Sequence, residues 1–102
     1  MAKAVYQCTF KLKKGADVEA FLDAAQKLND GYISRQKGYV SWQQLNDGDT
    51  WMDICTFESM EDVMTFLDNA QNPDELALAF YAFINLNSCV SRQYTIARSY
   101  GK

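Results

Sequence analysis

Asp53 combines an ionisable side chain with a position at which the sequence pattern calls for an apolar one. It lies within the run WMDICTF at residues 51–57, which reads as a β-strand. A carboxylate among apolar neighbours is unfavourable, so this group must be paired, protonated or hydrated. As an unpaired group with a raised pKa, Asp53 is a candidate catalytic base or ligand anchor. The alternative is a structural role, in an ion pair with Arg92 or Arg35 or in a hydrogen bond with the Trp42 indole.

Aromatic residues are the second candidate component of a site. Aromatic residues make up 14% of the chain, a high share for a core of this size, which indicates a cavity or an interface with bulky walls. Trp42, Trp51, Tyr6 and Phe57 could wall a flat pocket between sheet and helices that accepts an aromatic ligand. The same residues could instead simply pack in the core.

The other reactive residue types are weaker candidates for a catalytic or binding role than Asp53. Arg92 and Arg98 share one face of the expected last strand, where they could anchor an anion or form ion pairs at a sheet edge or dimer interface. Cys8 and Cys55 are poor candidate nucleophiles, because no neighbouring base lowers the pKa of either thiol. The chain contains no histidine, the commonest metal ligand and proton shuttle. We therefore expect neither a metal nor a cofactor.

Composition narrows the class of protein. A net charge of −3 and a pI near 4.7 argue against a nucleic-acid partner, whose phosphates require a basic surface. We expect no membrane association, because the sequence has neither a long apolar run nor a signal-type start. The three cysteines are odd in number and widely spaced, which indicates free thiols in a reducing compartment. The expected location is the cytoplasm.

The segment that carries Asp53 reads as a hairpin. Asp47-Gly48 predicts a tight turn between two alternating runs. We expect Leu45 to pair with Thr50, which places Trp42 opposite Asp53. One face then carries Val40, Trp42, Gln44, Trp51, Asp53, Cys55 and Phe57, and the other carries Tyr39, Ser41, Gln43, Leu45, Met52 and Ile54. Both faces are largely apolar, so both should be covered.

The remaining elements follow from periodicity and capping residues. Residues 4–13 alternate as a strand, and a helix with its N-cap at Asp17 follows. Ser59 is expected to cap a second helix, and Asn72-Pro73 to start a third, from 74 to about 86. Residues 90–100 alternate as the last strand. The order β-α-β-β-α-β predicts one α+β domain over residues 1–102, ferredoxin-like, with a four-stranded antiparallel sheet. Its helix-free face should be covered by a second copy, forming a homodimer.

Three short motifs make the sequence similar to a known superfamily. They are Gly38-Tyr39-Val40-Ser41, Trp51-Met52-Asp53-Ile54 and Phe57-Glu58-Ser59. With the order of elements, they resemble the dimeric α+β barrels of the antibiotic-biosynthesis-monooxygenase-like (ABM-like) superfamily. The resemblance implies two sheets meeting in a barrel and a pocket in each subunit. Its members include cofactor-free monooxygenases of polycyclic aromatic molecules, haem-degrading enzymes and small isomerases.

The resemblance also assigns positions in the pocket. Where haem-degrading members have Asn, Trp and His, this chain has Cys8, Phe57 and, near the third position, Leu67, which disfavours haem degradation. The first functional hypothesis is a cofactor-independent monooxygenase or isomerase acting on a small aromatic or polyketide-like molecule. In that case Asp53 is the base and Tyr6, Cys8, Trp42, Trp51, Phe57 and Leu67 line the pocket, with Arg92 as a candidate anion anchor. The second is a non-catalytic dimeric ligand-binding or stress-related module.

Overall fold

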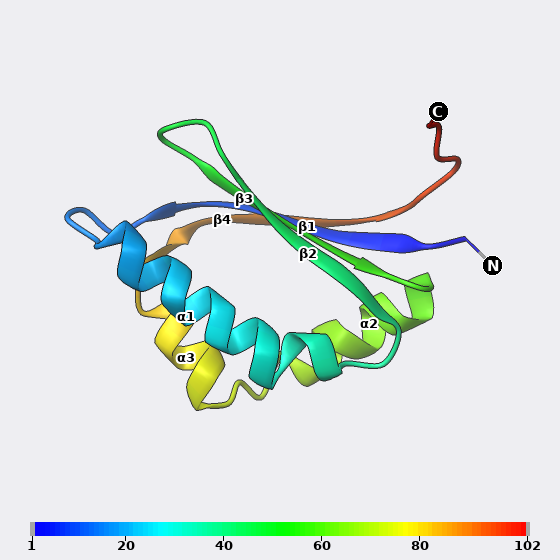
Figure 1. The fold of residues 1–102 in the computed structure, drawn as a ribbon, viewed down its shortest axis with the longest axis horizontal. Coiled ribbons are helices and arrows are strands. Elements are labelled where there is room, and N and C mark those ends of the chain that lie inside the picture. Colours follow the sequence, from blue (N-terminus) through cyan, green and yellow to red (C-terminus); the bar gives the residue numbers. More distant parts are fainter. Residues whose placement is uncertain (1, 102) are drawn as a thin grey trace.

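A single antiparallel sheet with all of its helices on one face forms the fold (Figure 1). The structure is a computed structural model and describes residues 2–101. Its strands are β1 (Ala4–Leu12), β2 (Tyr39–Asn46), β3 (Trp51–Phe57) and β4 (Ile84–Thr95), arranged in the order β2-β3-β1-β4. Its helices are α1 (Val18–Gly31), the 3-10 helix η1 (Ile33–Arg35), α2 (Met60–Asn69) and α3 (Glu75–Tyr81). This arrangement confirms the predicted ferredoxin-like fold.

Each α-helix begins at a side chain that accepts a hydrogen bond from a backbone N–H of its first turn. Asp17 accepts from the amide of Ala20 at 3.2 Å, and Ser59 accepts from that of Asp62 at 3.1 Å, as the sequence predicted. The start of α3 differs from the prediction: Asp74, rather than Asn72, caps the helix, and Pro73 lies outside it. The longest helix, α1, has 14 residues. Within residues 2–101, no helix is both long enough and apolar enough to cross a membrane.

The boundary between α3 and β4 was predicted wrongly. The helix was expected to reach residue 86, but α3 ends at Tyr81 and β4 already begins at Ile84. Ile84 pairs with Leu12, and the Ser88 hydroxyl accepts a hydrogen bond from the Lys11 amide at 2.8 Å. Pairing with β1 thus places residues from Ile84 onward in the sheet rather than in the helix. This is a long-range effect that periodicity does not reveal. The strand also ends at residue 95 rather than 100.

The hairpin pairing was predicted two residues out of register. Gln44 pairs with Asp53 and Trp42 with Cys55, instead of the expected Trp42–Asp53 pair. The four-residue turn lies at positions 47–50 rather than the expected 46–49, because the Asp47 carboxylate accepts hydrogen bonds from the amides at positions 49 and 50. A shift of two residues preserves the alternation, so Trp42, Gln44 and Asp53 still share a face.

At the start of β2 the predicted faces were exchanged. A bulge between Tyr39 and Ser41 breaks the alternation of the strand. Tyr39 consequently lies on the helix-covered side, where its hydroxyl donates a hydrogen bond to Asn29 Oδ1 at 2.9 Å. Val40, expected on that side, is instead 39% exposed.

The core lies between the sheet and the helices, and its largest fully buried side chains include Phe10, Phe21 and Phe57. Phe21 of α1 stacks on Phe80 of α3, with ring centroids 5.1 Å apart, and also meets Trp51 edge-on at 5.1 Å. On the helix-free face, apolar side chains stay in contact with solvent: Leu45 is 45%, Val90 59% and Tyr94 47% exposed. One face of the sheet is therefore sealed by helices, whereas the described chain leaves the other uncovered.

Candidate functional site

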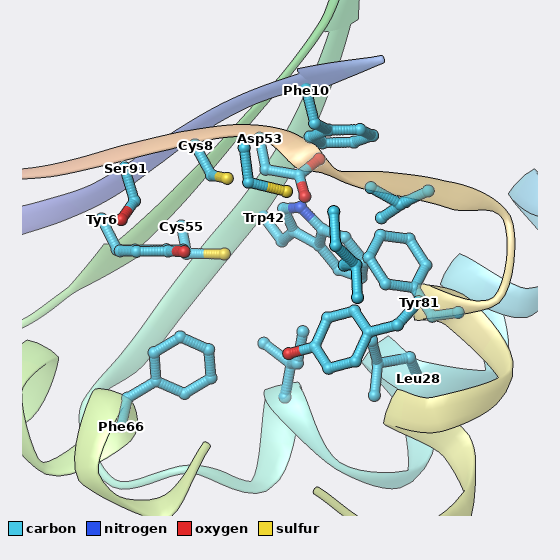
Figure 2. A pocket seen from close by; sticks show the side chains of 15 residues that line it. Tyr6, Cys8, Phe10, Leu28, Trp42, Asp53, Cys55, Phe66, Tyr81 and Ser91 are labelled. Carbon is cyan, nitrogen blue, oxygen red and sulfur yellow. The ribbon is translucent and has the colours of Figure 1, made fainter. Parts of the chain in front are cut away.

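A cavity of about 150 Å³ lies between the sheet and the helices (Figure 2). All four strands contribute side chains to its wall, as do α1, η1, α2 and α3. Aromatic and aliphatic groups form most of the wall. Its polar side chains include Asp53, Trp42, Tyr6, Tyr81 and Ser91.

Asp53 is placed in this wall by the alternation of β3, and it is only 8% exposed. Gln44, its cross-strand partner, donates a hydrogen bond from Nε2 to Asp53 Oδ1 at 3.2 Å. Neither expected arginine pairs with it. Arg35 Nε donates to the backbone carbonyl of Asp30, and the salt bridge found within residues 2–101 joins Lys11 to Asp49 on the surface. The ion-pair interpretation of Asp53 is therefore wrong.

The Trp42 indole lies beside the same carboxyl group. Figure 2 shows its nitrogen next to an Asp53 oxygen, and this proximity lowers the pKa of Asp53. The Nε1 atom is nevertheless buried without a partner that satisfies ordinary hydrogen-bond geometry. The indole N–H thus approaches the carboxyl group closely enough to influence its ionisation, without forming a well-aligned hydrogen bond.

Burial raises the pKa of Asp53 to about 7, because the apolar cavity wall disfavours the charged form. The hydrogen bond from Gln44 and the neighbouring Trp42 indole oppose this shift without cancelling it. A carboxyl group with this pKa exchanges protons near neutral pH, which is the property required of a general acid or base.

Three cysteines from different strands meet at this cavity. Cys8 of β1, Cys55 of β3 and Cys89 of β4 all line it. Burial raises the pKa of Cys8 to about 11 and also raises those of Cys55 and Cys89. All three thiols are therefore mostly protonated and poorly nucleophilic at neutral pH.

Several lining residues were not identified from the sequence. Ser91 and Cys89 reach the cavity because β4 pairs with β1, with Ser91 opposite Cys8. Tyr81 lies at the end of α3, which was predicted to continue past it. Strand alternation places residues 89 and 91 on one face of β4. That this is the same face of the sheet as Cys8 follows only from the pairing of β4 with β1.

The predicted pocket residues divide into two groups. Tyr6, Cys8 and Trp42 line the cavity together with Asp53. Trp51 instead packs against Phe21, and Phe57 is completely buried against Phe66, with ring centroids 5.1 Å apart. Leu67 packs against the core from α2 and does not reach the cavity wall.

Arg92 lies on the other side of the sheet. It pairs with Gln7, whose side chain contacts Met52 on the helix-free face. Arg98 follows the end of β4 and lies over the Tyr100 ring at 6.0 Å. Neither guanidinium can therefore anchor an anion in this cavity, because the alternation of β4 points Arg92 away from it.

The donor set does not suit a bound metal or haem. Among residues 2–101, no three His, Cys, Asp or Glu side chains are grouped closely enough to hold a metal ion. A cavity of about 150 Å³ is also too small for a tetrapyrrole.

Solved structures of similar fold include an oxygenase and a haem degrader. No protein-family description and no curated protein matches the sequence. A mutant of SnoaB, a cofactor-independent oxygenase from Streptomyces nogalater, is 15% identical with a TM-score of 0.73, and all of both chains is covered. The haem degrader MhuD from Mycobacterium tuberculosis is 15% identical with a TM-score of 0.65, covering 96% of this chain and 99% of MhuD.

A third structure is described as a dimeric ferredoxin-like protein from an uncultured marine organism. It is 7% identical with a TM-score of 0.64, covering 100% of this chain and 94% of that one. Other similar structures are described as putative antibiotic biosynthesis monooxygenases. The fold and the cavity define a ferredoxin-like α+β protein with a partly open pocket that contains one carboxyl group. Its fold is shared with SnoaB and with structures described as putative antibiotic biosynthesis monooxygenases, as the superfamily resemblance implied.

Proposed function

We propose that this protein is a cofactor-independent monooxygenase or isomerase that acts on a small aromatic molecule, with Asp53 as the general base. The observation that carries the proposal is a nearly buried carboxyl group without a counter-ion in the wall of a mostly apolar cavity. Its pKa of about 7 allows it to accept a proton from a weakly acidic substrate near neutral pH. The oxygenases that share this fold support the same class of reaction.

The oxidative form of the reaction needs only substrate and dioxygen. Asp53 removes a proton from an activated CH₂ group beside the ring, and the resulting carbanion adds to dioxygen. The peroxide anion takes the proton back from Asp53 to give a hydroperoxide. Loss of the remaining C–H proton and cleavage of the O–O bond give a ketone and one molecule of water. In the isomerase form, Asp53 returns the proton to a different carbon, and no oxygen is consumed.

The size of the cavity restricts the substrate. Its volume of about 150 Å³ resembles that of engineered protein cavities that hold one benzene molecule. Pockets for drug-sized ligands usually measure about 300–1,000 Å³. The substrate is therefore a single-ring compound, smaller than the polycyclic molecules that the superfamily resemblance implies.

Catalysis by Asp53 can be tested by measuring oxygen consumption and product formation with a panel of single-ring compounds that carry an activated CH₂ group, with a chelator present. The dependence of kcat/KM on pH should show an apparent pKa near 7. Asp53→Asn should lower the rate by about 10²–10⁴-fold, the usual contribution of a general base. The exposed helix residue Asp23 provides the control, since Asp23→Asn should retain the wild-type rate. Equal rates in both variants would exclude Asp53 as the base.

The modest cavity volume also favours a second function, that of a non-catalytic binding module. In that case a ligand would bind in the cavity, but neither oxygen consumption nor isomerisation would accompany binding. The Asp53→Asn variant separates the two functions, because a binding module would show changed affinity with no reaction to lose.

We also propose that two copies associate through their helix-free sheet faces. This face exposes a row of apolar side chains, including Leu45, Val90 and Tyr94. Soluble proteins seldom leave such a surface unpaired, and a sheet with helices on one side needs a cover on the other. The similar structure described as a dimeric ferredoxin-like protein supports this arrangement.

A further inference from the structure

The cavity has an acidic group but no basic one. Among its lining residues, Asp53 is the only carboxylic acid, and none is lysine or arginine. The chain has no histidine. A ligand with a carboxylate or phosphate group would therefore meet a carboxyl group and no compensating charge. The cavity disfavours anionic ligands on electrostatic grounds.

The Asp53 carboxylate also has unused hydrogen-bonding capacity. An ionised carboxyl group accepts about four hydrogen bonds, and the bond from Gln44 Nε2 is the one found here within ordinary geometry. A ligand that completes this set must supply N–H or O–H donors. An ammonium group suits the position best, because it has three donors, no acceptor and the missing positive charge.

Aromatic rings form much of the remaining wall. Trp42 of β2 and Phe80 of α3 meet at 5.6 Å with their planes at 78°, and Tyr81 and Phe66 approach from the helix side (Figure 2). The negative faces of aromatic rings attract organic cations, and tryptophan is the strongest partner. The wall therefore suits a ligand that is both cationic and apolar.

We infer that the cavity selects a single-ring aromatic ligand carrying a protonated amine, with the ammonium group paired to Asp53 and the ring between Trp42 and the helix-side aromatic residues. This inference rests on the cavity being a ligand site, as in the proposed function, and adds the chemical class of the ligand. It does not require that Asp53 catalyse a reaction.

Three compounds of similar size but different charge provide the test. Benzylammonium, benzyl alcohol and benzoate are titrated into the wild-type protein at pH 8 by calorimetry. Chemical shifts of the Trp42 indole N–H, read by NMR, locate the binding. We expect benzylammonium to bind at least about ten-fold more tightly than benzyl alcohol, and benzoate to bind most weakly. Asp53→Asn should remove the preference for the amine, while Asp23→Asn should leave it intact.

The pH dependence of binding provides a second test of the inference, and this test needs no variant. From pH 6 to pH 8, the affinity for benzylammonium should rise about ten-fold, because Asp53 ionises with a pKa of about 7 while the amine stays charged. The other ionisable groups in the cavity wall all have raised pKa values and stay neutral over this range: Tyr6, Cys8, Cys55, Tyr81 and Cys89. Affinity for benzyl alcohol should not rise over the same range.

Several results would overturn the inference. These are binding of benzyl alcohol or benzoate at least as tight as that of the amine, an amine affinity that does not change with pH, or no binding of any of the three compounds. Tight binding of benzyl alcohol with turnover of a neutral substrate would leave the proposed general base intact. Absence of turnover together with selective amine binding would leave this inference standing and remove the catalytic proposal.

Discussion

Gln44 and Asp53 face each other across the β2–β3 hairpin, and Gln44 donates a hydrogen bond from Nε2 to Asp53 Oδ1 at 3.2 Å. This bond is the main protein contact opposing the effect of burial on the carboxyl pKa. It also leaves the carboxyl group as part of the cavity wall. The hairpin register therefore controls both the position and the ionisation of the candidate catalytic group.

Removing the Gln44 amide should raise the pKa of Asp53 further above 7, because the donor that favours the ionised form is lost. Gln44→Leu has a similar size and no hydrogen-bonding group. The carboxyl pKa can be followed by NMR titration of carbon-13-labelled aspartate. Gln43→Leu is the matched control, because this neighbouring glutamine is exposed on the opposite face. An unchanged Asp53 titration in Gln44→Leu would show that the hydrogen bond does not control the pKa.

Asp53 should make the folded state less stable as the pH rises. Its folded pKa of about 7 exceeds the unfolded value of about 3.9, so the folded protein holds the proton that the unfolded chain has released between these values. Stability contributed by the protonated group is full below pH 4 and is lost as the pH passes through 7. The loss amounts to about 4 kcal/mol at most.

Asp53→Asn should remove this pH dependence, since an amide does not ionise. Urea unfolding at pH 5 and pH 8 is the measurement, and the variant should gain about 2–3 kcal/mol relative to wild type between the two values. Asp23→Asn should follow the wild-type curve. A parallel pH dependence in the Asp53 variant would mean that the folded carboxyl group titrates normally.

Gly38 should tolerate alanine less well than Gly48. Both have positive φ, at +79° and +100°, so alanine costs about 1–2 kcal/mol at either position. At Gly38 an added Cβ would also collide with the Asp62 side chain, whereas at Gly48 it meets open space. We expect Gly38→Ala to lower the free energy of unfolding by at least about 1 kcal/mol more than Gly48→Ala. Equal losses would indicate that the Asp62 side chain moves aside freely.

Val90→Lys should weaken the proposed dimer. Val90 is 59% exposed on the helix-free face, where a lysine would place a charge in the expected interface. Sedimentation at micromolar concentration should give a dimer for wild type and a smaller species for the variant. Met64→Lys serves as the control, because Met64 is 52% exposed on α2, away from the sheet. A wild-type monomer under these conditions would contradict the proposed association.

Local features of the sequence were sufficient to predict most of the elements and, beyond the bulge at the start of β2, the faces of the hairpin strands. Alternation placed Asp53 and Trp42 on one side of the hairpin, and the short side chains of Asp17 and Ser59 marked two helix starts. These features survive tertiary folding because they depend on neighbouring residues within a turn or a strand. An error of two residues in the hairpin register left the faces unchanged for the same reason.

Only the tertiary structure decided which side chains meet. Cys89 and Ser91 join Cys8 at the cavity because β4 pairs with β1, about 80 residues away in the chain. Arg92, one residue further on, is turned to the opposite face and cannot neutralise Asp53. Whether a buried carboxyl group finds a counter-ion depends on such long-range pairings, and no local pattern encodes them. The sequence alone thus placed a carboxylate inside the protein, and the pairing of distant strands left it without a positive partner.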